Sequence, residues 1–569
     1  MKRSIDEKNE PTDEQMFSAV SFCIMLVLVG IPLWWKTTEV YRVSLPYSEI
    51  DVLHELNVKI KMNIHVVTIH ELTGEALVKD LENLFKMSKI YSIIFKHHAI
   101  DKALLGSSKT LLAVENKIKH PHFEGSLQLF EVPGLSRFTP HNIIVGQNRT
   151  IYFSSDAGKI NYEICKYIVK HNIQNHISVS DAMKLYNFVS QTILNEAALV
   201  NAIMEVNLPV RNDLNEYQRH KLPLASDFDI LFTVLNPEPE WVDIEFNLYE
   251  AIEDYISPLT DQLKDMHEFH IKSQWLYFVG LQAQPKFLNY TDKGPHFALS
   301  ADLLPHVITP LEKKLGMLIN RASPIYIYTR KGHQVEGANA FISPKWGGIQ
   351  VYNPDRTHYI HILEVVVEMP CLRHTLHSCL YARKSCVAGG RATVAIDEQY
   401  AMSVFLHQFR LLLGIPDISE YEETNAAQHL RLWEKDFLLR TRTVDQLTSA
   451  KLTLQSLSKL LGKINNIVIN DQVGEAIHLT LENIHKTTVA LRQGNLTEAY
   501  KQSKMAFLAS EKAFTDPSLL ALLYFPDDQK YAVYIPLFLP IMIPVLISFK
   551  HIAQWGKTKL NNSKKLKMT

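Results

Sequence analysis

Two long stretches without a charged residue, one near each end of the chain, limit most strongly what this sequence can fold into. The first, Met16–Trp35, has 20 residues, and the second, Tyr531–Phe549, has 19. At about 1.5 Å of rise per residue, a helix of this length crosses about 30 Å, the thickness of the hydrocarbon core of a bilayer. Trp34 and Trp35 lie where aromatic residues gather at a membrane interface. We therefore expect two single transmembrane helices.

A cleaved signal peptide is the alternative interpretation of the first stretch. The apolar region of a signal peptide has about 7–15 residues and leads into a cleavage site of small residues. Here the apolar run is longer and ends in IPLWWK at residues 31–36. An uncleaved membrane anchor therefore fits this stretch better.

The charges that follow the second stretch predict its orientation. Residues 550–569 form a basic tail with six lysines and no acidic residue. The positive-inside rule puts such a tail in the cytosol. With two spans, residues 1–15 must then be cytosolic as well, and residues 36–530 must lie on the lumenal side. Within that loop we expect an α/β domain over residues 36–420 and a helical region over residues 421–530.

Short motifs agree with a location in the endoplasmic-reticulum membrane. Asn148, Asn289 and Asn495 each begin an acceptor sequon for N-glycosylation inside the lumenal loop. A further sequon at Asn561 falls in the predicted cytosolic tail and is expected to stay unmodified. Lys565 and Lys567 have the KxKxx spacing of a dilysine retrieval signal. The alternative for these two lysines is an ordinary basic flank of a membrane span.

Three prolines recur every four residues on one face of the second stretch. Pro536, Pro540 and Pro544 have no N–H, so three backbone carbonyls lose their usual partners inside the membrane. In lipid such groups need partners from neighbouring helices, hydroxyl groups or water. One hypothesis is that this helix packs within a membrane assembly of several subunits. The other is a kinked anchor that tolerates its prolines.

The composition is that of a folded chain. Hydrophobic residues make up 46% and charged residues 21% of the 569 residues, enough to build a sizeable core. Lysine and arginine number 59 against 60 acidic residues, and this net charge of -1 argues against a nucleic-acid binder that relies on counterion release. Five cysteines are too few for a small domain held together by disulfides.

The hydrophobic periodicity of the lumenal loop alternates between strands and helices, which predicts a mixed α/β fold. Expected strands cover residues 58–69, 142–145, 150–154, 229–235, 275–281, 324–329, 341–343 and 349–352. Expected helices cover residues 180–204, 241–255, 303–315 and 398–413. Residues 426–515 predict two to four antiparallel helices, with weak turn signals at Gly462, Gly474 and Gly494.

The sequence contains no motif that identifies a catalytic, cofactor or metal site. GxGxxG after a strand, GxxxxGK[ST], HExxH and GxSxG are all missing, and His267-Glu-Phe-His270 has the wrong spacing for a zinc site. Cys371, His374, His377 and Cys379 are the densest potential ligands, but their spacing matches no common metal site. We therefore expect no catalytic residue, no cofactor and no metal.

Two groups of residues leave alternatives open. Cys371, Cys379 and Cys386 are candidates for a local disulfide, or for buried thiols, in an oxidising lumen. Four acidic residues flank one predicted strand and could serve a two-carboxylate hydrolysis or could simply be solvated. These four are Asp227, Asp229, Glu238 and Glu240.

Several segments resemble the PIG-S family, the S subunits of the glycosylphosphatidylinositol (GPI) transamidase. The first block is Trp34–Glu39 with Tyr41-Arg42 and Leu45-Pro-Tyr47. Later blocks follow in the order of the family: Leu235-Asn-Pro-Glu-Pro239, Leu304–Glu312, Asn339–Phe341, Ser343–Gly348 and Leu411-Leu-Leu-Gly414. The resemblance runs from residue 34 to residue 414, and the membrane spans lie at the ends, as in the family.

This resemblance implies a non-catalytic subunit of an endoplasmic-reticulum complex that attaches GPI anchors to protein C-termini. In that complex the nucleophilic cysteine and histidine belong to the caspase-like subunit PIG-K. The other implied partners are PIG-T, PIG-U and the metallopeptidase-like Gaa subunit, with the proprotein and the GPI lipid as substrates. We expect a scaffold that positions these components. The alternatives are an independent lumenal hydrolase that uses the Cys371–Cys386 region, and a chaperone or trafficking receptor.

Overall fold

The computed structural model describes most of the chain between residues 13 and 566. The described residues are 13–30, 32–33, 36, 41–101, 113–114, 117–118, 123–132, 135, 143–154, 178–204, 222, 224–225, 227–236, 239–240, 242–278, 286–288, 296–300, 315–319, 325–328, 339–343, 347–353, 359–361, 392–418, 429–464, 467–521 and 527–566.

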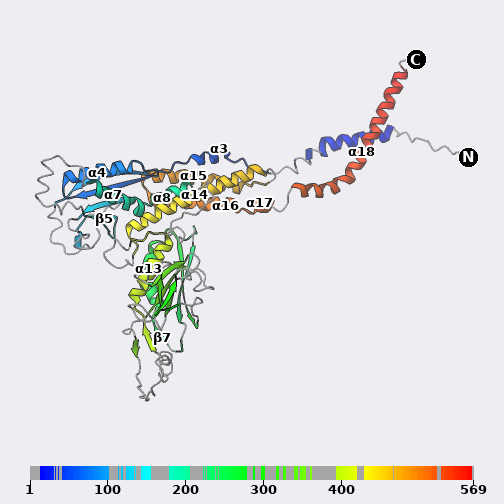
Figure 1. The fold of residues 1–569 in the computed structure, drawn as a ribbon. Coiled ribbons are helices and arrows are strands. Elements are labelled where there is room, and N and C mark those ends of the chain that lie inside the picture. Colours follow the sequence, from blue (N-terminus) through cyan, green and yellow to red (C-terminus); the bar gives the residue numbers. More distant parts are fainter. Residues whose placement is uncertain are drawn as a thin grey trace. The chain divides into compact units, whose positions relative to one another are not determined.

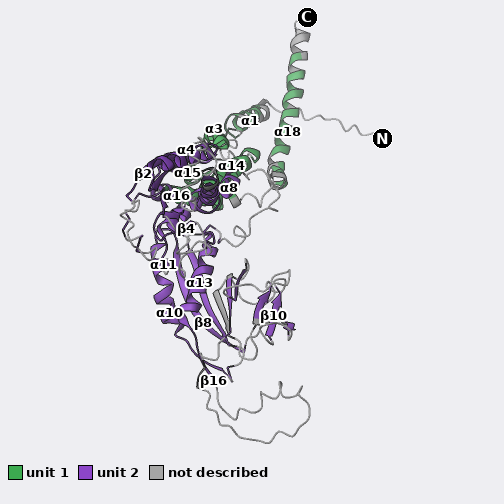
Figure 2. Cartoon of the chain, turned by 60° about the vertical axis from the view of Figure 1, so that its left-hand side comes forward, with its two compact units in different colours: residues 1–57, 447–486, 502–569 green, residues 58–446, 487–501 purple. Residues whose placement is uncertain are grey.

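The chain forms two compact units, and each is assembled from segments that are distant in sequence (Figure 2). Unit 1 comprises residues 1–57, 447–486 and 502–569, and unit 2 comprises residues 58–446 and 487–501. The last described strand ends at Ala395, and all described secondary-structure elements after it are helices. The expected mixed α/β fold with a helical C-terminal part is therefore confirmed.

Unit 2 begins with a five-stranded sheet of order β2-β1-β3-β5-β4. Its strands are β1 (Ile60–Thr68), β2 (Tyr91–Ala99), β3 (Ser126–Glu131), β4 (Ile143–Val145) and β5 (Thr150–Phe153). All neighbours are parallel except β4 and β5, which form the antiparallel hairpin expected from the sequence. The predicted strand over residues 58–69 is confirmed as β1.

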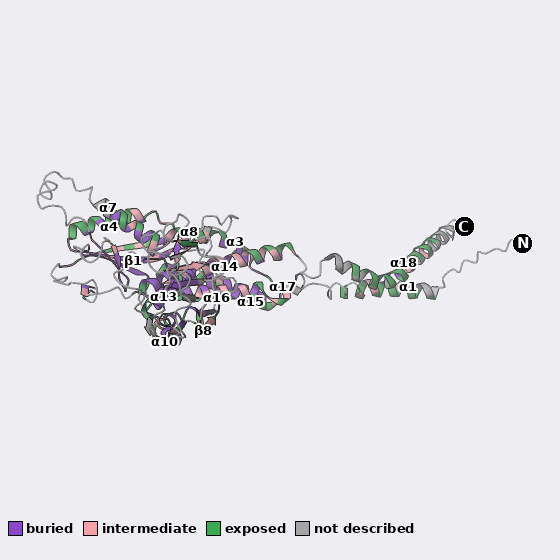
Figure 3. Cartoon of the chain, turned by 60° about the horizontal axis from the view of Figure 1, so that its bottom comes forward, coloured by how far each residue is buried: buried purple, intermediate pink, exposed green. Residues whose placement is uncertain are grey.

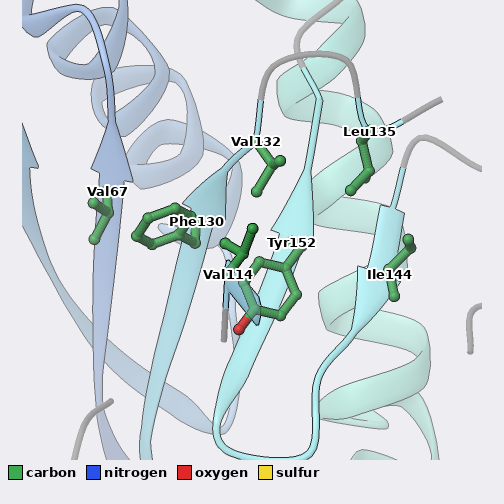
Figure 4. Close-up of a cluster of buried hydrophobic side chains, with 7 residues drawn as sticks. All are labelled: Val67, Val114, Phe130, Val132, Leu135, Ile144 and Tyr152. Atoms are coloured by element: carbon green, nitrogen blue, oxygen red, sulfur yellow. The ribbon is translucent and has the colours of Figure 1, made fainter. Parts of the chain in front are cut away.

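A cluster of buried apolar side chains lies at one end of this sheet. Figure 4 shows the side chains next to one another: Val67 of β1, Phe130 of β3, Tyr152 of β5 and Ile144 of β4, with Val114, Val132 and Leu135 from outside these strands. The rings of Phe130 and Tyr152 meet edge to face, with centroids 6.0 Å apart. Because their strands are adjacent in the sheet, alternate residues of each strand bring these side chains onto one face.

The helices of this part are α4 (Glu71–Phe85), α7 (Ser178–Phe188) and α8 (Glu196–Met204), and α4 packs against β1, β2 and α7 (Figure 1). The predicted single helix over residues 180–204 is wrong. A π-helical turn, η6 (Val189–Ile193), and the positive φ of Asn195 (47°) interrupt it. The hydroxyl of Tyr91 donates a hydrogen bond to the carbonyl of Leu194 at 2.8 Å. Burial raises the pKa of this Tyr91 phenol to about 12.

A second five-stranded sheet has the order β13-β14-β11-β6-β8. Its strands are β6 (Asp227–Asn236), β8 (Glu268–Tyr277), β11 (Leu315–Ile319), β13 (Ala340–Ser343) and β14 (Gly347–Tyr352). They are parallel except for β13, which pairs antiparallel with β14. Smaller sheets are built from β9 (Lys286–Leu288), β10 (His296–Ser300), β12 (Ile325–Tyr328), and from β7 (Val242–Glu245), β15 (Tyr359–His361) and β16 (Ala392–Ala395).

One prediction in this region needs correction, and another lies almost entirely outside the described residues. The expected helix over residues 241–255 begins only at Leu248, because Asn247 caps α10 (Leu248–Tyr255) and its side chain accepts a hydrogen bond from the N–H of Glu250. Residues 242–245 instead form β7, which pairs with β16. The expected helix over residues 303–315 lies outside the described residues except for Leu315, which starts β11. The short helix α11 (Ser257–Gln262) follows α10.

Helix α13 (Glu398–Leu413) has the bounds that the sequence predicts, and both of its ends explain why. Asp397 accepts a hydrogen bond from the N–H of Tyr400 at 3.0 Å and so caps the first turn. Gly414 has a φ of 89°, and its N–H bonds to carbonyls of the last turn. Glycine adopts this left-handed conformation without strain. The helix packs against β13 and β14 (Figure 1).

The C-terminal region contains three long helices, within the predicted number. They are α14 (Leu432–Lys463), α15 (Asp471–Gln493) and α16 (Leu496–Phe514), and α17 (Pro517–Ala521) follows. Gly494, with a φ of 85°, forms the turn between α15 and α16. Gly474 lies inside α15 and Gly462 inside α14, so these two turn signals were wrong.

Unit 1 joins the N-terminal segment to the start of α15 through backbone pairing. The N–H of Val43 donates to the carbonyl of Ile469, and the N–H of Ile469 donates to the carbonyl of Tyr41, both at 3.1 Å. The guanidinium of Arg42 donates to the carbonyl of Leu461 at 2.8 Å. Pro46 directly precedes α3 (Tyr47–Val52), which leads into η2 (Leu53–Glu55). The family-like residues Tyr41-Arg42 and Leu45–Tyr47 therefore have structural roles here.

The two ends of the chain are helical in unit 1. Helix α1 (Asp13–Met25) continues into the π-helical turn η1 (Leu26–Gly30), and α18 (Asp527–Leu566) contains Pro536, Pro540 and Pro544. Figure 1 shows that α18 bends along its length, as internal prolines cause. Among the described residues, no helix has both the length and the apolar character required to cross a membrane.

The N-terminal half of α14 buries two acidic side chains, and each meets an arginine from another part of unit 2. Asp436 binds Arg149, from the turn between β4 and β5, through two contacts of 2.6 and 2.9 Å. It also accepts the N–H of Gly125 at 3.2 Å. Glu434 binds Arg410 of α13 at 3.1 Å. The helix is thereby tied to the turn of the first sheet and to the helix that covers the second.

Two buried arginines of α14 bind backbone carbonyls instead. Arg440 donates to the carbonyl of Ile193 at 3.2 Å, and Arg442 donates to those of Leu222 at 3.1 Å and Leu413 at 3.4 Å. Burial lowers the pKa of the Arg442 guanidinium, although Asp445 and Tyr500 oppose the shift. These side chains give irregular backbone a hydrogen-bonding partner where water has been excluded.

We predict that Asp436→Asn lowers the free energy of unfolding by about 3–5 kcal/mol, because it removes the carboxylate charge that the buried Arg149 guanidinium binds. Thermal and denaturant unfolding of the detergent-purified full chain measures this. The control is Asp229→Asn, which removes an exposed pair with Lys272 at 3.2 Å and should cost less than about 1 kcal/mol. Equal losses from both variants would contradict the prediction.

A second prediction concerns a histidine pair on the first sheet. The Nδ1 of His65 and the Nε2 of His98 are 3.2 Å apart, and the two rings stack with centroids 5.4 Å apart. Partial burial, and then the charges of His98 and Lys96, lower the pKa of His65 below its ordinary value of about 6.5. As the pH falls through about 6.5, the unfolded chain therefore binds more protons than the folded chain.

The stability that His65 contributes is thus present above a pH of about 6.5 and is lost on acidification toward its lower folded pKa. We expect the melting temperature of the full chain to fall with pH over this window, and His65→Gln to make that fall smaller. The same substitution at the exposed His478 serves as the control. An unchanged pH dependence in His65→Gln would show that this pair does not titrate as described.

Candidate functional site

A cleft of about 450 Å³ lies at the carboxyl ends of β6 and β8. It is lined by the last residues of both strands, by Pro239 and Glu240 after β6, and by the first three residues of β7. The edge of a parallel sheet where the strands end is the usual place for ligands in α/β folds. This position makes the cleft the best candidate for a binding site among the described residues.

Aromatic side chains form one wall of the cleft. Trp275 and Tyr277 lie two residues apart on β8, so they point to the same face of the strand. Their rings stack with centroids 6.2 Å apart and planes 16° apart. Phe278 follows directly, and it is 68% exposed, while Tyr277 is 51% exposed. Three neighbouring aromatic residues therefore remain partly open to solvent at one end of an edge strand.

The backbone at Phe278 is in a conformation that a bulky residue rarely adopts. Its φ is +61°, in the left-handed region, and its N–H donates to the carbonyl of Asn236 at 2.9 Å. The Asn236 side chain is buried and donates to the carbonyl of Val242 at 3.0 Å. A non-glycine residue held in this region costs on the order of 1–3 kcal/mol, and such residues cluster at binding sites. The bonds of Asn236 thus hold β6, β7 and Phe278 in one arrangement.

The charged groups of the cleft are acidic. Glu240 and Asp243 line it and are exposed, and the lining residues that the structure describes include no lysine, arginine or histidine. A concave site with two carboxylates and exposed aromatic faces suits a cation, because the faces of aromatic rings carry negative potential. The site therefore has the chemistry to bind an ammonium or guanidinium group.

Three of the acidic residues that the sequence suggested for hydrolysis lie at opposite ends of a strand. Asp227 and Asp229 lie at the start of β6, whereas Glu240 lies beyond its end. At about 3.3 Å per residue, Asp227 is about 30 Å and Asp229 about 23 Å from the last residue of β6. Asp229 instead pairs with Lys272, and Glu238 lies outside the described residues. Two-carboxylate hydrolysis needs separations below about 10 Å, so Asp227 and Asp229 do not form such a site with Glu240.

The histidines of the sequence His267–His270 lie at the start of β8 and not on a helix. His267 is buried, and its Nδ1 is 3.0 Å from the carbonyl of Ala225. His270 is exposed on the strand. In the part of the chain that the structure describes, no group of three or more histidine, cysteine, aspartate or glutamate residues is placed to hold a metal ion.

The predicted glycosylation sites differ in their surroundings. Asn148 is half-buried in the turn between β4 and β5, and Asn289 lies outside the described residues. Asn495 is exposed, and its Oδ1 caps α16 by accepting the N–H of Glu498 at 3.1 Å. The hydroxyl of Thr497, the third residue of this sequon, donates to Glu124 at 2.7 Å.

The other predicted site residues lie mostly outside the described part. These are Cys371, Cys379, Cys386 and Lys567, while Lys565 belongs to α18. Four residues of the cleft were not predicted from the sequence as site residues: Trp275, Tyr277, Phe278 and Asp243. The alternation of aromatic residues at positions 275 and 277 was a usable signal, but their exposure depends on β8 being an edge strand.

Comparison with known proteins gives a consistent result along the chain. The family model described as "Phosphatidylinositol-glycan biosynthesis class S protein", PIG-S, matches residues 21–559. The chain is 33% identical to a GPI-anchor transamidase component PIGS of Rattus norvegicus over 575 residues, with 94% of both chains covered. It is 33% identical to that of Homo sapiens over 578 residues, again with 94% of both covered. The GPI transamidase component PIG-S homolog of Schizosaccharomyces pombe is 23% identical and covers 96% of this chain.

Proposed function

This chain belongs to the PIG-S family and is a subunit of the GPI transamidase complex, and we propose that it organises this complex without catalysing a step itself. The observation that carries this proposal is the extent of the match. The relatives named as GPI-anchor transamidase components align over 94% of the chain, so the similarity is not limited to one shared domain.

A role in positioning agrees with the chemistry of the described residues. Asp227 and Asp229 lie at the opposite end of β6 from Glu240, and the cleft beyond that strand carries aromatic and acidic groups suited to binding. A subunit that holds the proprotein, the GPI lipid and the catalytic subunit together lowers the entropic cost of their encounter. The partners that the resemblance implies are the caspase-like subunit PIG-K, PIG-T, PIG-U and the Gaa subunit.

The proposed location is the endoplasmic-reticulum membrane, with residues 16–35 and 531–549 as spans and both termini in the cytosol. The exposed side chains of the terminal helices support this topology. Phe17, Leu28, Ile535 and Leu546 are between 56% and 80% exposed. Figure 3 shows that α1 and α18 carry many exposed residues. Helices α1 and α18 also contact each other within unit 1. Apolar helix surfaces that the chain itself leaves uncovered are suited to contact with lipid.

The prolines of α18 suggest how this helix contributes to assembly. Pro536, Pro540 and Pro544 lie inside one continuous helix and are themselves exposed. Each removes a backbone hydrogen bond inside the proposed span, and a neighbouring subunit could supply the missing partners. The proposed assembly role of this face would be excluded if leucine at all three positions left recovery of the complex unchanged.

We further propose that the lumenal sequons are glycosylated, with Asn495 more accessible than Asn148. A glycan attaches to Nδ2 of asparagine, whereas the cap of α16 uses Oδ1, so both can coexist at Asn495. Asn148 and Asn289 complete the proposed set. A disulfide among Cys371, Cys379 and Cys386, or buried thiols at these positions, and retrieval through Lys565 and Lys567 remain predictions from the sequence.

The topology is tested by glycosylation mapping in cells. We expect Asn495→Gln to remove one glycan, seen as a shift in gel mobility that endoglycosidase H treatment abolishes for the wild type. Asn561→Gln should cause no shift, because residue 561 lies in the proposed cytosolic tail. A chain without glycans, whose middle region is cleaved by protease added outside sealed microsomes, would overturn the proposed topology.

The function is tested by deletion and by affinity capture. Cells without this chain should lose GPI-anchored proteins from their surface, and the wild-type chain should restore them. A tagged chain in mild detergent should recover the other subunits in fixed stoichiometry. Cysteine-dependent activity of the chain alone would favour a hydrolase, and variable folded cargo would favour a chaperone or trafficking receptor.

A further inference from the structure

We propose that the cleft at the ends of β6 and β8 receives a loop of another subunit of the complex and binds a lysine or arginine side chain from that loop. This inference rests on the proposed organising function and deepens it. It names one surface of the chain, and it states the chemistry of the group that this surface recognises.

The charge of the cleft selects a cationic group. Glu240 and Asp243 provide two carboxylates, and none of the described residues that line the cleft is basic. The stacked pair Trp275 and Tyr277 adds aromatic faces beside these acids. A guanidinium or ammonium group between carboxylates and aromatic rings gains both ionic and cation–π attraction.

The aromatic residues also identify the surface as one that a protein covers. Tyrosine, tryptophan and phenylalanine are enriched at the cores of protein interfaces, where they supply much of the binding free energy. Here Phe278 keeps its ring 68% exposed on a backbone with a φ of +61°. The chain thus tolerates both an exposed apolar ring and backbone strain at this one position. A partner that buries the ring recovers the free energy of removing it from water.

The strand beside the cleft favours a polypeptide over other ligands. β8 is a ten-residue edge strand, and no strand in the described part of the chain pairs with its outer side. An extended segment can add to such an edge through backbone hydrogen bonds while its side chains enter the neighbouring pocket. A carbohydrate or lipid headgroup cannot use the edge in this way. The volume of about 450 Å³ has room for a turn of chain around the basic side chain.

The first test is photo-cross-linking of the full chain in cells, with p-benzoylphenylalanine in place of Phe278. We expect an adduct with one other protein subunit, and its cross-linked peptide should contain or adjoin a lysine or arginine. The matched control puts the same residue at Tyr249, which is 70% exposed in the same unit and does not line the cleft. An adduct with a glycolipid, no adduct at position 278, or the same adduct at both positions would overturn the proposal.

The second test is charge reversal in the tagged full-length chain. Glu240→Lys together with Asp243→Lys should reduce recovery of the partner subunit at least about tenfold, because two like charges then face the incoming cation. The control makes the same charge change at the starts of β6 and β8, far from the cleft, with Asp227→Lys and Glu268→Lys. Both variants must keep the melting temperature and glycosylation pattern of the wild type.

A further variant separates the ring from the backbone. Phe278→Gly removes the ring and also removes the strain, since glycine adopts a positive φ freely. We expect unchanged or higher stability together with reduced recovery of the partner. If the wild-type chain recovers no subunits, the proposed function fails. If it does recover them, and the cleft variants recover as much as the controls, only the present inference fails.

Discussion

The fold of unit 2 depends on the buried charges of α14. Charged side chains are costly to remove from water, and a buried pair stabilises a fold only when its geometry is good and its remaining polar atoms have partners. Asp436 meets this condition through two contacts with Arg149 and a third with the N–H of Gly125. These directional bonds hold the N-terminal half of α14 against a turn of the first sheet. Glu434 and Arg410 do the same toward α13.

The buried ion pairs and the cleft place opposite requirements on the same unit. At Arg149 and Asp436 the unit satisfies its charges internally and excludes water. At Glu240, Asp243 and Phe278 it leaves charge and apolar surface uncovered. The same unit gives the buried carboxylate of Asp436 three hydrogen-bond donors, but it leaves Glu240 and Asp243 exposed. We therefore consider the uncovered residues at the ends of β6 and β8 to be adapted to contact outside the chain.

The sequence was sufficient where a local signal determines an element. Asp397 and Gly414 mark both ends of α13, and alternation of apolar residues identifies β1 and the hairpin of β4 and β5. It failed where the deciding contact is distant or the backbone is unusual. The pairing of residues 242–245 with β16, about 150 residues later, overrides a pattern that resembles a helix. No periodicity could reveal the π-helical turn at η6 or the positive φ of Phe278. The aromatic wall of the cleft could not be predicted from the sequence either, because the exposure of Trp275 and Tyr277 depends on the order of the strands in the sheet.

The discontinuous composition of the two units has a consequence for biosynthesis. Residues 1–57 belong with residues 447–486 and 502–569, so the 389 residues from 58 to 446 must emerge before unit 1 can be completed. At about 5–20 residues per second, translation of that insertion takes roughly 20–80 s. During this interval Tyr41 and Val43 lack the backbone of Ile469 as a hydrogen-bonding partner. A chain truncated before Ile469 therefore cannot form the backbone hydrogen bonds between residues 41–43 and Ile469, and its N-terminal segment stays unpaired.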